Sequence, residues 1–278
     1  MWKRTNQFAK AIPEFDDLDL LAIVGSSQIG RLRYSLGEAL VEDIPAQSIE
    51  EILTYGGTAD LFVSLLERFA TYSGISGVQP KVLVRGLDAP DKLVHRGATH
   101  IIKAFDPAVY EELAANELIC MRGAAAAGIA TAPVRLSDNR RFLVVDRFDL
   151  SSGGVYLGIE DFCVLEGRRA HGRYDGSYET VARRIADFVS PEFLLGATEQ
   201  YARMVAYACG IENGDAHLKN FSVIYDNPEG SVRLAPAYDL VATTPYIPRD
   251  TLRGNQKRSP TIFSLRAHSA LAASGSRA

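Results

Sequence analysis

The pattern of hydrophobic and polar positions changes character several times along the chain, and each change predicts a different kind of element. Within residues 48–74, apolar positions recur at helical spacing in two pieces that a pair of glycines separates. Ser48 followed by Glu51 predicts a capping box for the first piece, and Thr58 is the predicted N-cap of the second. Gly74 follows where a left-handed helix terminator is expected. Two short helices are therefore predicted in this region.

Short runs rich in β-branched residues follow at 81–86, 92–97 and 99–105, and turn-forming residues separate them. These runs predict a small antiparallel sheet. A further strand is predicted at 141–148, where hydrophobic residues lead into the sequence VVDRFD. The first half of the chain is therefore expected to carry a sheet.

A long helix is predicted between the third run and that last strand. Asp106 is its expected N-cap, and Pro107 occupies the first helical position, where a missing N–H costs nothing. Gly128 is the predicted end of the helix. Glu117 would then lie in its middle.

After residue 150 the pattern favours helices. Ser177 is the predicted cap of one helix, and Pro191 is the predicted start of another that ends near Gly210. A hairpin is predicted at 221–236, turned by the sequence DNPEG.

The expected fold class is α+β, because a sheet-bearing first half is joined by one strand to a helical second half. We expect an N-terminal lobe over 1–148 and a mainly helical C-terminal lobe over 149–252. The remaining residues, 253–278, include five basic residues, no acidic residue and many small ones. That composition predicts a disordered tail and a truncated C-terminal lobe.

The overall charge and the cysteines narrow the class of protein. The 278 residues carry a formal net charge of −4 and a pI near 5.8, so the whole molecule does not attract nucleic acid or an anionic membrane. The three cysteines form no C-x-x-C pair, which disfavours a disulfide framework and a zinc knuckle. Neither a secretory signal nor an apolar run of the ~20 residues that a membrane helix needs is visible. A cytoplasmic location is expected.

Four polar residues near the predicted hairpin have the spacing of a phosphotransfer site. Asp215 precedes Asn220 by five positions, as the catalytic aspartate precedes the metal-binding asparagine in kinases. We expect Asn220 and the later Asp239 to supply hard oxygen ligands to Mg²⁺. Asp215 would orient or deprotonate the acceptor hydroxyl, and Lys219 would stabilise the transferred phosphoryl group. For any one of these residues alone, capping of a turn or helix is the more frequent role.

Lys103 and Glu117 fit the same interpretation. Lys103 alternates with apolar neighbours at the end of a predicted strand, which suits a lysine that reaches the α- and β-phosphates of ATP. Glu117, on the following helix, is its expected partner. The alternative is a solvated strand lysine and a solvated helix glutamate. For His217 we favour a scaffolding role within the catalytic loop over a metal-ligand role, because no second histidine or cysteine lies near it.

A loop punctuated by glycines, GISGVQPK at 74–81, separates the first helices from the sheet. It is not a Walker motif, but its backbone N–H groups suit a phosphate. We expect Gly77, Gln79 and Lys81 to bind the nucleotide there, with an ordinary helix-to-strand turn as the alternative.

The sequence VVDRFD is predicted to lie where the two lobes meet, and its backbone is the expected partner of adenine. Asp146 and Phe148 mark this second part of the nucleotide site. For the side chains of Asp146 and Arg147, an exposed charge pair is the favoured interpretation.

Together these residues resemble the HipA-like serine/threonine kinase toxins of bacterial toxin–antitoxin systems. The resemblance rests on GISGVQPK, THIIK, the Asn116–Glu117 pair, VDRFD, NGDAHLKN and APAYDLV, in that order across residues 74–241. It implies a two-lobed, protein-kinase-like fold that binds ATP and Mg²⁺. It also implies that Lys103 binds the ATP phosphates and Asp215 is catalytic.

The resemblance further implies autophosphorylation of a serine in the glycine-rich loop, here Ser76, as a self-inactivating step. A phosphate there adds roughly −1.5 to −2 charge beside the nucleotide phosphates. The chain resembles the short HipT kinases of three-component systems, in which the N-terminal subdomain of longer members is a separate small protein. That small protein and an antitoxin are the expected partners.

Three functions remain open from the sequence. The first is a kinase that inhibits growth by phosphorylating a protein target, which the family resemblance suggests is an aminoacyl-tRNA synthetase. The second is an inactive nucleotide-binding relative that docks an antitoxin. The third is a small-molecule phosphotransferase of related fold. No direct contact with nucleic acid is expected in any of them.

Overall fold

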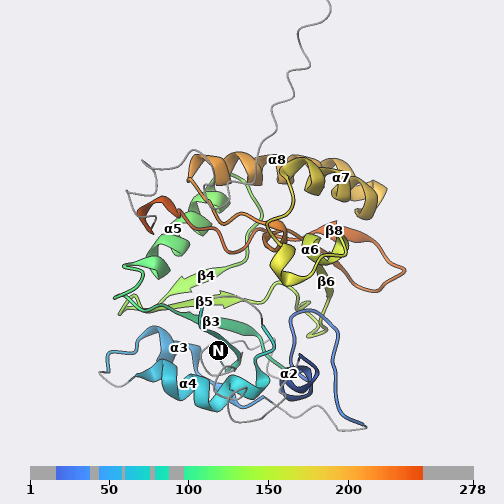
Figure 1. Ribbon diagram of the computed structural model, residues 1–278. Helices are drawn as coiled ribbons and strands as arrows, with labels where there is room; N and C mark the ends of the chain where they lie inside the picture. Colours follow the sequence, from blue (N-terminus) through green and yellow to red (C-terminus); the bar gives the residue numbers. More distant parts are fainter. Residues whose placement is uncertain (1–16, 38–43, 58–59, 76–78, 88–96, 247–278) are drawn as a thin grey trace, which may run out of the picture.

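The computed structural model describes residues 17–37, 44–57, 60–75, 79–87 and 97–246. Within them the chain has the expected α+β fold, with a five-stranded sheet, a three-stranded sheet and helices on both sides of the larger one (Figure 1). The predicted tail at 253–278 lies outside the described residues.

The five-stranded sheet has the order β1-β2-β3-β5-β4, and only the β1–β2 pair is parallel. Its strands are β1 (Ala46–Gln47), β2 (Lys81–Gly86), β3 (His100–Ala104), β4 (Val134–Leu136) and β5 (Phe142–Asp146). The strands predicted at 81–86, 99–105 and 141–148 are confirmed. The run predicted at 92–97 lies almost entirely outside the described residues, and β4 was not predicted.

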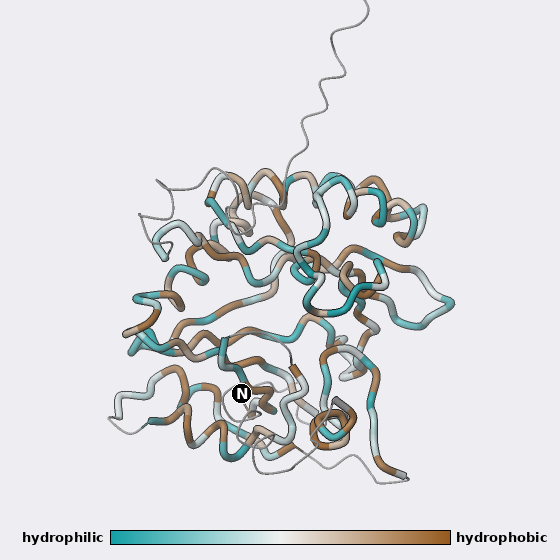
Figure 2. The backbone as a smooth tube through the Cα atoms, in the orientation of Figure 1, coloured by the Kyte–Doolittle hydropathy of each residue, from teal (hydrophilic) through white to brown (hydrophobic). Residues whose placement is uncertain are grey.

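Strand β5 divides its side chains between two hydrophobic cores. Phe142 and Val144 point into a core with α3 and α4, whereas Leu143 and Val145 point into the core that holds α5, α7 and α8. Successive side chains of a strand face opposite sides of a sheet, so one strand supplies both cores. Figure 2 shows the hydrophobic stretches that run along the sheet and the helices packed on it.

Three short helices cover one face of this sheet: α2 (Asp17–Val24), α3 (Ile49–Leu53) and α4 (Leu61–Phe69), the last continued by the 3₁₀ turn η1 (Ala70–Tyr72). The predicted cap of the first piece is confirmed, because Ser48 Oγ accepts a hydrogen bond from the Glu51 N–H at 3.2 Å. The cap of α4 is Asp60, which accepts from the Val63 N–H. Thr58, the predicted cap, lies outside the described residues.

Gly74 has a different role from the predicted one. Its φ is not in the left-handed region, so it is not a left-handed helix terminator. Instead its N–H donates to Ser27 O at 2.9 Å, and a Cβ at this position would lie 2.5 Å from that oxygen. Glycine is needed here because two backbone segments approach closely.

The helix predicted from Pro107 begins later, as α5 (Leu113–Ala126). Asp106 caps only a turn, accepting from the Ala108 N–H at 2.9 Å, and Glu112 then adopts a left-handed conformation with φ 55°. The chain therefore changes direction before the helix starts, and Glu117 lies in its first turns rather than its middle. The predicted end is confirmed, since Gly128 has φ 75°.

The second half carries the remaining elements. They are β6 (Gly158–Asp161), α6 (Phe162–Leu165), η3 (Ala170–Gly172), α7 (Tyr178–Phe188), α8 (Pro191–Gly210), η4 (Leu218–Asn220), β7 (Ser222–Tyr225), β8 (Val232–Leu234) and η5 (Thr244–Tyr246). The Ser177 cap of α7, the start of α8 at Pro191 and its end at Gly210 are confirmed. The hairpin is confirmed as β7–β8, and β6 joins it as a strand that was not predicted.

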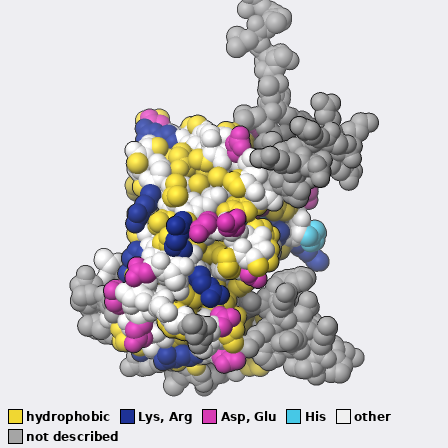
Figure 3. Space-filling view, turned by 90° about the vertical axis from the view of Figure 1, so that its left-hand side faces the viewer, with side chains coloured by type: hydrophobic (Ala, Val, Ile, Leu, Met, Phe, Trp, Pro, Cys, Tyr) yellow, Lys and Arg dark blue, Asp and Glu magenta, His cyan; other side chains and the backbone are white. Residues whose placement is uncertain are grey.

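In the described ranges, no helix combines the length and the hydrophobicity that a transmembrane segment requires. On the face seen in Figure 3, hydrophobic side chains gather on the upper half, and acidic and basic side chains are interspersed over the rest. This face therefore has no extended area of one charge.

Candidate active site

Three charged side chains from distant parts of the chain meet beside strand β3. The Lys103 ammonium lies 2.5 Å from Glu117 Oε1 on α5, and it also pairs with Asp239 Oδ1. Lys103 projects on the opposite side of the sheet from its neighbours Ile102 and Ala104, which belong to the other core. The predicted pairing of Lys103 with Glu117 is present, and Asp239 joins it.

Burial and charge set the protonation of this cluster. Burial lowers the pKa of Lys103, but Asp239 and Glu117 outweigh it, so the net shift is upward and the ammonium stays charged. Burial raises the pKa of Glu117, which is 1% exposed, against the opposing effect of Lys103. Burial also tends to raise the pKa of Asp239, but Lys103 and then Lys81 lower it to about 2. Asp239, with 42% of its side chain exposed, therefore holds a stable negative charge that solvent can reach.

Lys81 adds a second buried cation. In the antiparallel β2–β3 pair Lys81 lies directly opposite Lys103, so both side chains emerge on one face of the sheet. Lys81 is 6% exposed, and burial lowers its pKa, with Asp239 opposing the shift. Two ammonium groups on adjacent strands suit a ligand that carries several negative charges.

The segment after Asp239 is fixed by α5. Asn116 Nδ2 donates to Ala242 O at 3.0 Å, and Asn116 Oδ1 accepts from the Ala242 N–H at 2.9 Å. Asp239 itself has a left-handed backbone with φ 55°, which is rare for a residue with a side chain. Two neighbouring residues near the start of α5 therefore fix the site. Glu117 binds Lys103, and Asn116 holds the backbone that follows Asp239.

Asp215 lies in a more open setting. Its side chain is 60% exposed, and Tyr174 Oη donates to Asp215 Oδ1 at 2.7 Å. The Tyr174 and His217 rings meet edge to face with centroids 4.8 Å apart, and His217 Nε2 lies 4.0 Å from Asp215 Oδ1. Burial lowers the pKa of His217, so its imidazole is neutral near pH 7 and packs as part of the loop.

The other residues predicted in the catalytic loop take the following positions. Asn220 ends the 3₁₀ turn η4, and its N–H donates to His217 O at 2.9 Å. The Lys219 ammonium donates to Asp161 Oδ2 at 2.5 Å, and Asp161 also caps α6. In this structure Lys219 therefore ties the loop to α6.

The strand VVDRFD differs from the prediction at one side chain. Asp146 pairs with Arg135 at 3.2 Å and lies 3.4 Å from His100 Nε2. The prediction that Arg147 is exposed is wrong, because its side chain is fully buried and binds Asp149 at 2.5 Å. The expected exposed pair does not form because Arg147 and Asp149, two positions apart on an extended chain, point to the same side.

The Arg147–Asp149 pair binds the backbone of residues 28–30, and Gln28 in turn contacts the start of the glycine-rich loop. Asp149 Oδ2 accepts from the Gly30 N–H at 2.6 Å, and Arg147 donates to Gln28 O at 3.0 Å. Gln28 forms a β-bridge with Gly74, at the start of that loop.

Phe148, Gln79 and Gly77 are the other residues that were predicted to bind the nucleotide. Phe148 stacks on Tyr238 with ring centroids 5.6 Å apart, next to Asp239 in the chain. In the glycine-rich loop, Gln79 is half-buried just before β2, whereas Ser76 and Gly77 lie outside the described residues.

A nucleotide with magnesium fits the described residues. One oxygen of Glu117, Oε2, is buried without a hydrogen-bond partner among the described residues. Lys103 binds the other oxygen, Oε1, and Lys81 lies opposite Lys103 in the β2–β3 pair. No group of three His, Cys, Asp or Glu side chains in the described ranges is arranged to hold a metal ion. Mg²⁺ would therefore rely on Asp239, the Asn220 amide and phosphate oxygens, as is usual for this ion.

Two residues of the site were not found from the sequence. Tyr174 is separated from Asp215 by 41 positions, and Asp161 from Lys219 by 58. No local pattern indicates either contact.

The family of the chain follows from a comparison with known proteins. Residues 73–277 match the family model described as the HipA-like C-terminal domain. The chain belongs to the HipA-like C-terminal domain family. The HipA-like match covers both the glycine-rich loop and the segment with Asp215 and Asp239.

Curated relatives have the names of kinases. The chain is 33% identical over 182 residues to "Putative kinase Y4mE" of Sinorhizobium fredii, covering 62% of this chain and 43% of that protein. It is 31% identical over 190 residues to a "Putative kinase" of Haemophilus influenzae, covering 62% of this chain and 53% of that protein. The chain therefore aligns with about half the length of these two relatives.

A solved structure supports the fold. HipA of Shewanella oneidensis, determined with HipB and its operator DNA, matches with a TM-score of 0.65 and 21% identity, over 87% of this chain and 62% of that one. The match confirms the HipA kinase-like α+β fold that was expected.

Proposed function

We propose that this HipA-like protein is an ATP- and Mg²⁺-dependent serine/threonine protein kinase. The observation that carries the proposal is the bridge from Lys103 to both Glu117 and Asp239, on the strand and helix where kinases hold their phosphate-binding lysine. A merely structural ion pair would not need a third, solvent-accessible carboxylate or the second buried cation, Lys81.

Each residue has a defined task in this proposal. Lys103 and Lys81 bind the phosphates of ATP, and Glu117 keeps Lys103 in place. Asp215 accepts a hydrogen bond from the acceptor hydroxyl and takes its proton as the oxygen attacks the γ-phosphorus. His217 keeps the loop that carries Asp215 in shape by packing, since its imidazole is neutral.

Asp239 and Asn220 would hold Mg²⁺. When bound, the ion neutralises the charge of the triphosphate. Asp239 suits this role because its low pKa keeps it ionised at every physiological pH. Asn116 would preserve the position of Asp239 by holding the backbone at Ala242.

We also propose a toxin–antitoxin role for the chain. The HipA structure that it resembles was determined with HipB and DNA. An antitoxin partner, a separate small protein in the manner of the HipT kinases, an aminoacyl-tRNA synthetase target and autophosphorylation at Ser76 are parts of this proposal. A Ser76→Ala protein should lose phosphate from the glycine-rich loop and inhibit growth more strongly.

The direct test is phosphate transfer from labelled ATP with MgCl₂, first by the chain alone and then with cell lysate. Asp215→Asn should reduce transfer about 10²- to 10⁴-fold, the usual contribution of a general base. The matched control is Asp226→Asn, an exposed carboxylate of the β7–β8 turn that lies 3.7 Å from Arg233. Equal rates for the two variants would reject Asp215 as the base, and label on metabolites alone would favour a small-molecule phosphotransferase.

A further inference from the structure

The segment between α6 and α7, residues 167–176, lies against the catalytic loop. We call it the arginine segment, because Arg168, Arg169 and Arg173 belong to it. Arg173 O accepts from the Leu218 N–H at 3.1 Å, and Tyr174 Oη donates to Asp215. Beneath it, Cys163 Sγ lies 3.5 Å from Arg169 O. The segment therefore borders the proposed acceptor position directly.

The arginine segment and the start of α7 contain more cationic than anionic side chains. Over residues 166–184 there are five arginines and one histidine against three acidic residues, whereas the whole chain has a net charge of −4. Glu166 and Asp187 neutralise Arg184. Arg168 lies only 3.9 Å from Glu166, at the limit of an ion pair.

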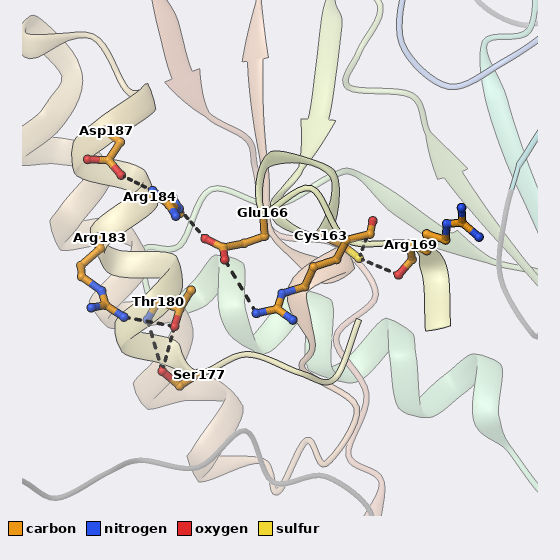
Figure 4. Close-up of polar contacts among 9 residues, drawn as sticks. Cys163, Glu166, Arg169, Ser177, Thr180, Arg183, Arg184 and Asp187 are labelled. Carbon is orange, nitrogen blue, oxygen red and sulfur yellow. Dashed lines mark hydrogen bonds and ion pairs between the residues drawn. The ribbon is translucent and has the colours of Figure 1, made fainter. Parts of the chain in front are cut away.

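Two arginines have no carboxylate partner among the described residues. Arg183 contacts only Thr180 Oγ1, at 3.5 Å, and the Arg169 guanidinium points away from Glu166 (Figure 4). Both are exposed. A solvent-facing guanidinium without an internal partner is available for a planar anion such as a carboxylate.

Tyr174 shows where the acceptor oxygen would lie. Its hydroxyl donates to Asp215 Oδ1, which is the hydrogen bond that an acceptor serine or threonine must make with a catalytic base. A residue that enters from solvent would replace the Tyr174 hydroxyl and bring its own flanking residues over the arginine segment.

We propose that the arginine segment, with Arg183, binds an acidic stretch of the protein acceptor next to the phosphorylated residue. This inference rests on the proposed kinase function and specifies its substrate class. A protein rather than a nucleic acid is favoured because acidic side chains, such as Asp175 and Glu179, are interspersed with the arginines. A phosphate backbone requires a row of cations, whereas single carboxylates can pair with separate guanidinium groups.

The test uses the full chain and two peptides of equal length, each with one serine, flanked by glutamates in one and by glutamines in the other. The ratio of kcat/KM for the acidic to the neutral peptide is expected to exceed one and to fall about tenfold in an Arg169→Glu, Arg183→Glu double variant. Arg203→Glu on α8, an exposed arginine near Glu199, is the matched control and should keep the wild-type ratio. Increasing salt should reduce the preference of the wild type.

Fluorescence anisotropy with the labelled acidic peptide, without ATP, measures binding independently of transfer. The double variant should bind it about tenfold more weakly than the Arg203→Glu control does. If Asp215-dependent transfer occurs but the two peptides react equally, this inference is wrong and the kinase proposal stands. If no acceptor gains phosphate although the acidic peptide still binds through Arg169 and Arg183, the kinase proposal fails. Competition by a short RNA that exceeds that of the acidic peptide would assign the surface to nucleic acid and overturn the inference.

Discussion

The two ends of the proposed reaction lie in different environments. Lys103, at the nucleotide end, is 3% exposed and bridges two carboxylates. Asp215, at the acceptor end, is 60% exposed and is held by one tyrosine hydroxyl and the packing of a neutral histidine. A fixed cluster of buried charges is suited to a ligand that is always the same, whereas an open carboxylate is suited to acceptors that must enter and leave. The comparison predicts that substitutions at the first end affect folding and activity together, and that those at the second affect activity alone.

Removal of the buried cation should have the largest effect. Lys103→Met leaves Glu117 buried without a counter-charge, which is expected to cost about 3–5 kcal/mol of unfolding free energy and to abolish transfer. Urea unfolding and the labelled-ATP assay measure the two effects. The double variant Lys103→Met, Glu117→Leu should recover stability and remain inactive. If the single variant is as stable as the wild type, the cluster does not stabilise the fold.

The two hydrogen bonds between Asn116 and Ala242 should contribute less to stability than the ion pairs of Lys103 do. Asn116→Ala removes both hydrogen bonds to Ala242, at an expected cost of roughly 1–3 kcal/mol. It should also raise the MgCl₂ concentration needed for half-maximal transfer, because Asp239 loses its support. Asn227→Ala, at an exposed turn where the side chain accepts from the Glu229 N–H, is the control. An unchanged magnesium dependence would exclude a role of Asn116 in positioning Asp239.

The low pKa of Asp239 gives a test by pH. Its carboxyl pKa is about 2 in the folded chain against an ordinary 3.8, so its ionised form stabilises the fold above pH 3.8, and this contribution is lost as the pH falls toward 2. The difference in stability between wild type and Asp239→Asn should be constant near neutral pH and should shrink below pH 4. A difference that does not change down to pH 2 would show that Lys103 does not lower this pKa.

The smallest effect is expected at the acceptor end. Tyr174→Phe removes one hydrogen bond to an exposed carboxylate, and water can replace it, so unfolding free energy should change by less than about 1 kcal/mol. Thermal unfolding of this variant beside Lys103→Met tests the comparison directly. A loss as large as that of Lys103→Met would mean that both ends are equally built into the fold.

Local signals in the sequence were sufficient for several elements. The Ser48 and Ser177 caps, the strand at 81–86 and the glycine at 128 each depend on neighbours within a few positions, and the structure agrees with all of them. The start of α5 was misplaced because Asp106 and Pro107 form a good local start, but the chain must first turn at Glu112 to reach the sheet. Tertiary packing overrode the local signal there.

The candidate site likewise contains residues that local patterns predict and residues that they do not. Lys103 and Glu117 could be paired from the sequence, because a strand followed by a helix brings them together. Arg147 was expected at the surface. It binds Gln28 O, 119 positions away, and its partner Asp149 binds the Gly30 N–H, also across 119 positions, and neither contact leaves a trace in a local pattern. Strand β4 was not predicted because its three residues, Val134–Leu136, are too few to establish a periodic pattern.

The position of strand β5 between the two cores predicts how the protein unfolds. Since Phe142 and Val144 serve one core and Leu143 and Val145 serve the other, neither core can release this strand without exposing apolar side chains of its neighbour. The amide protons of β3 and β5 are therefore expected to exchange with solvent only when the whole chain opens, and both halves should melt in a single transition. The four consecutive side chains of residues 142–145 are therefore expected to couple the unfolding of the two halves.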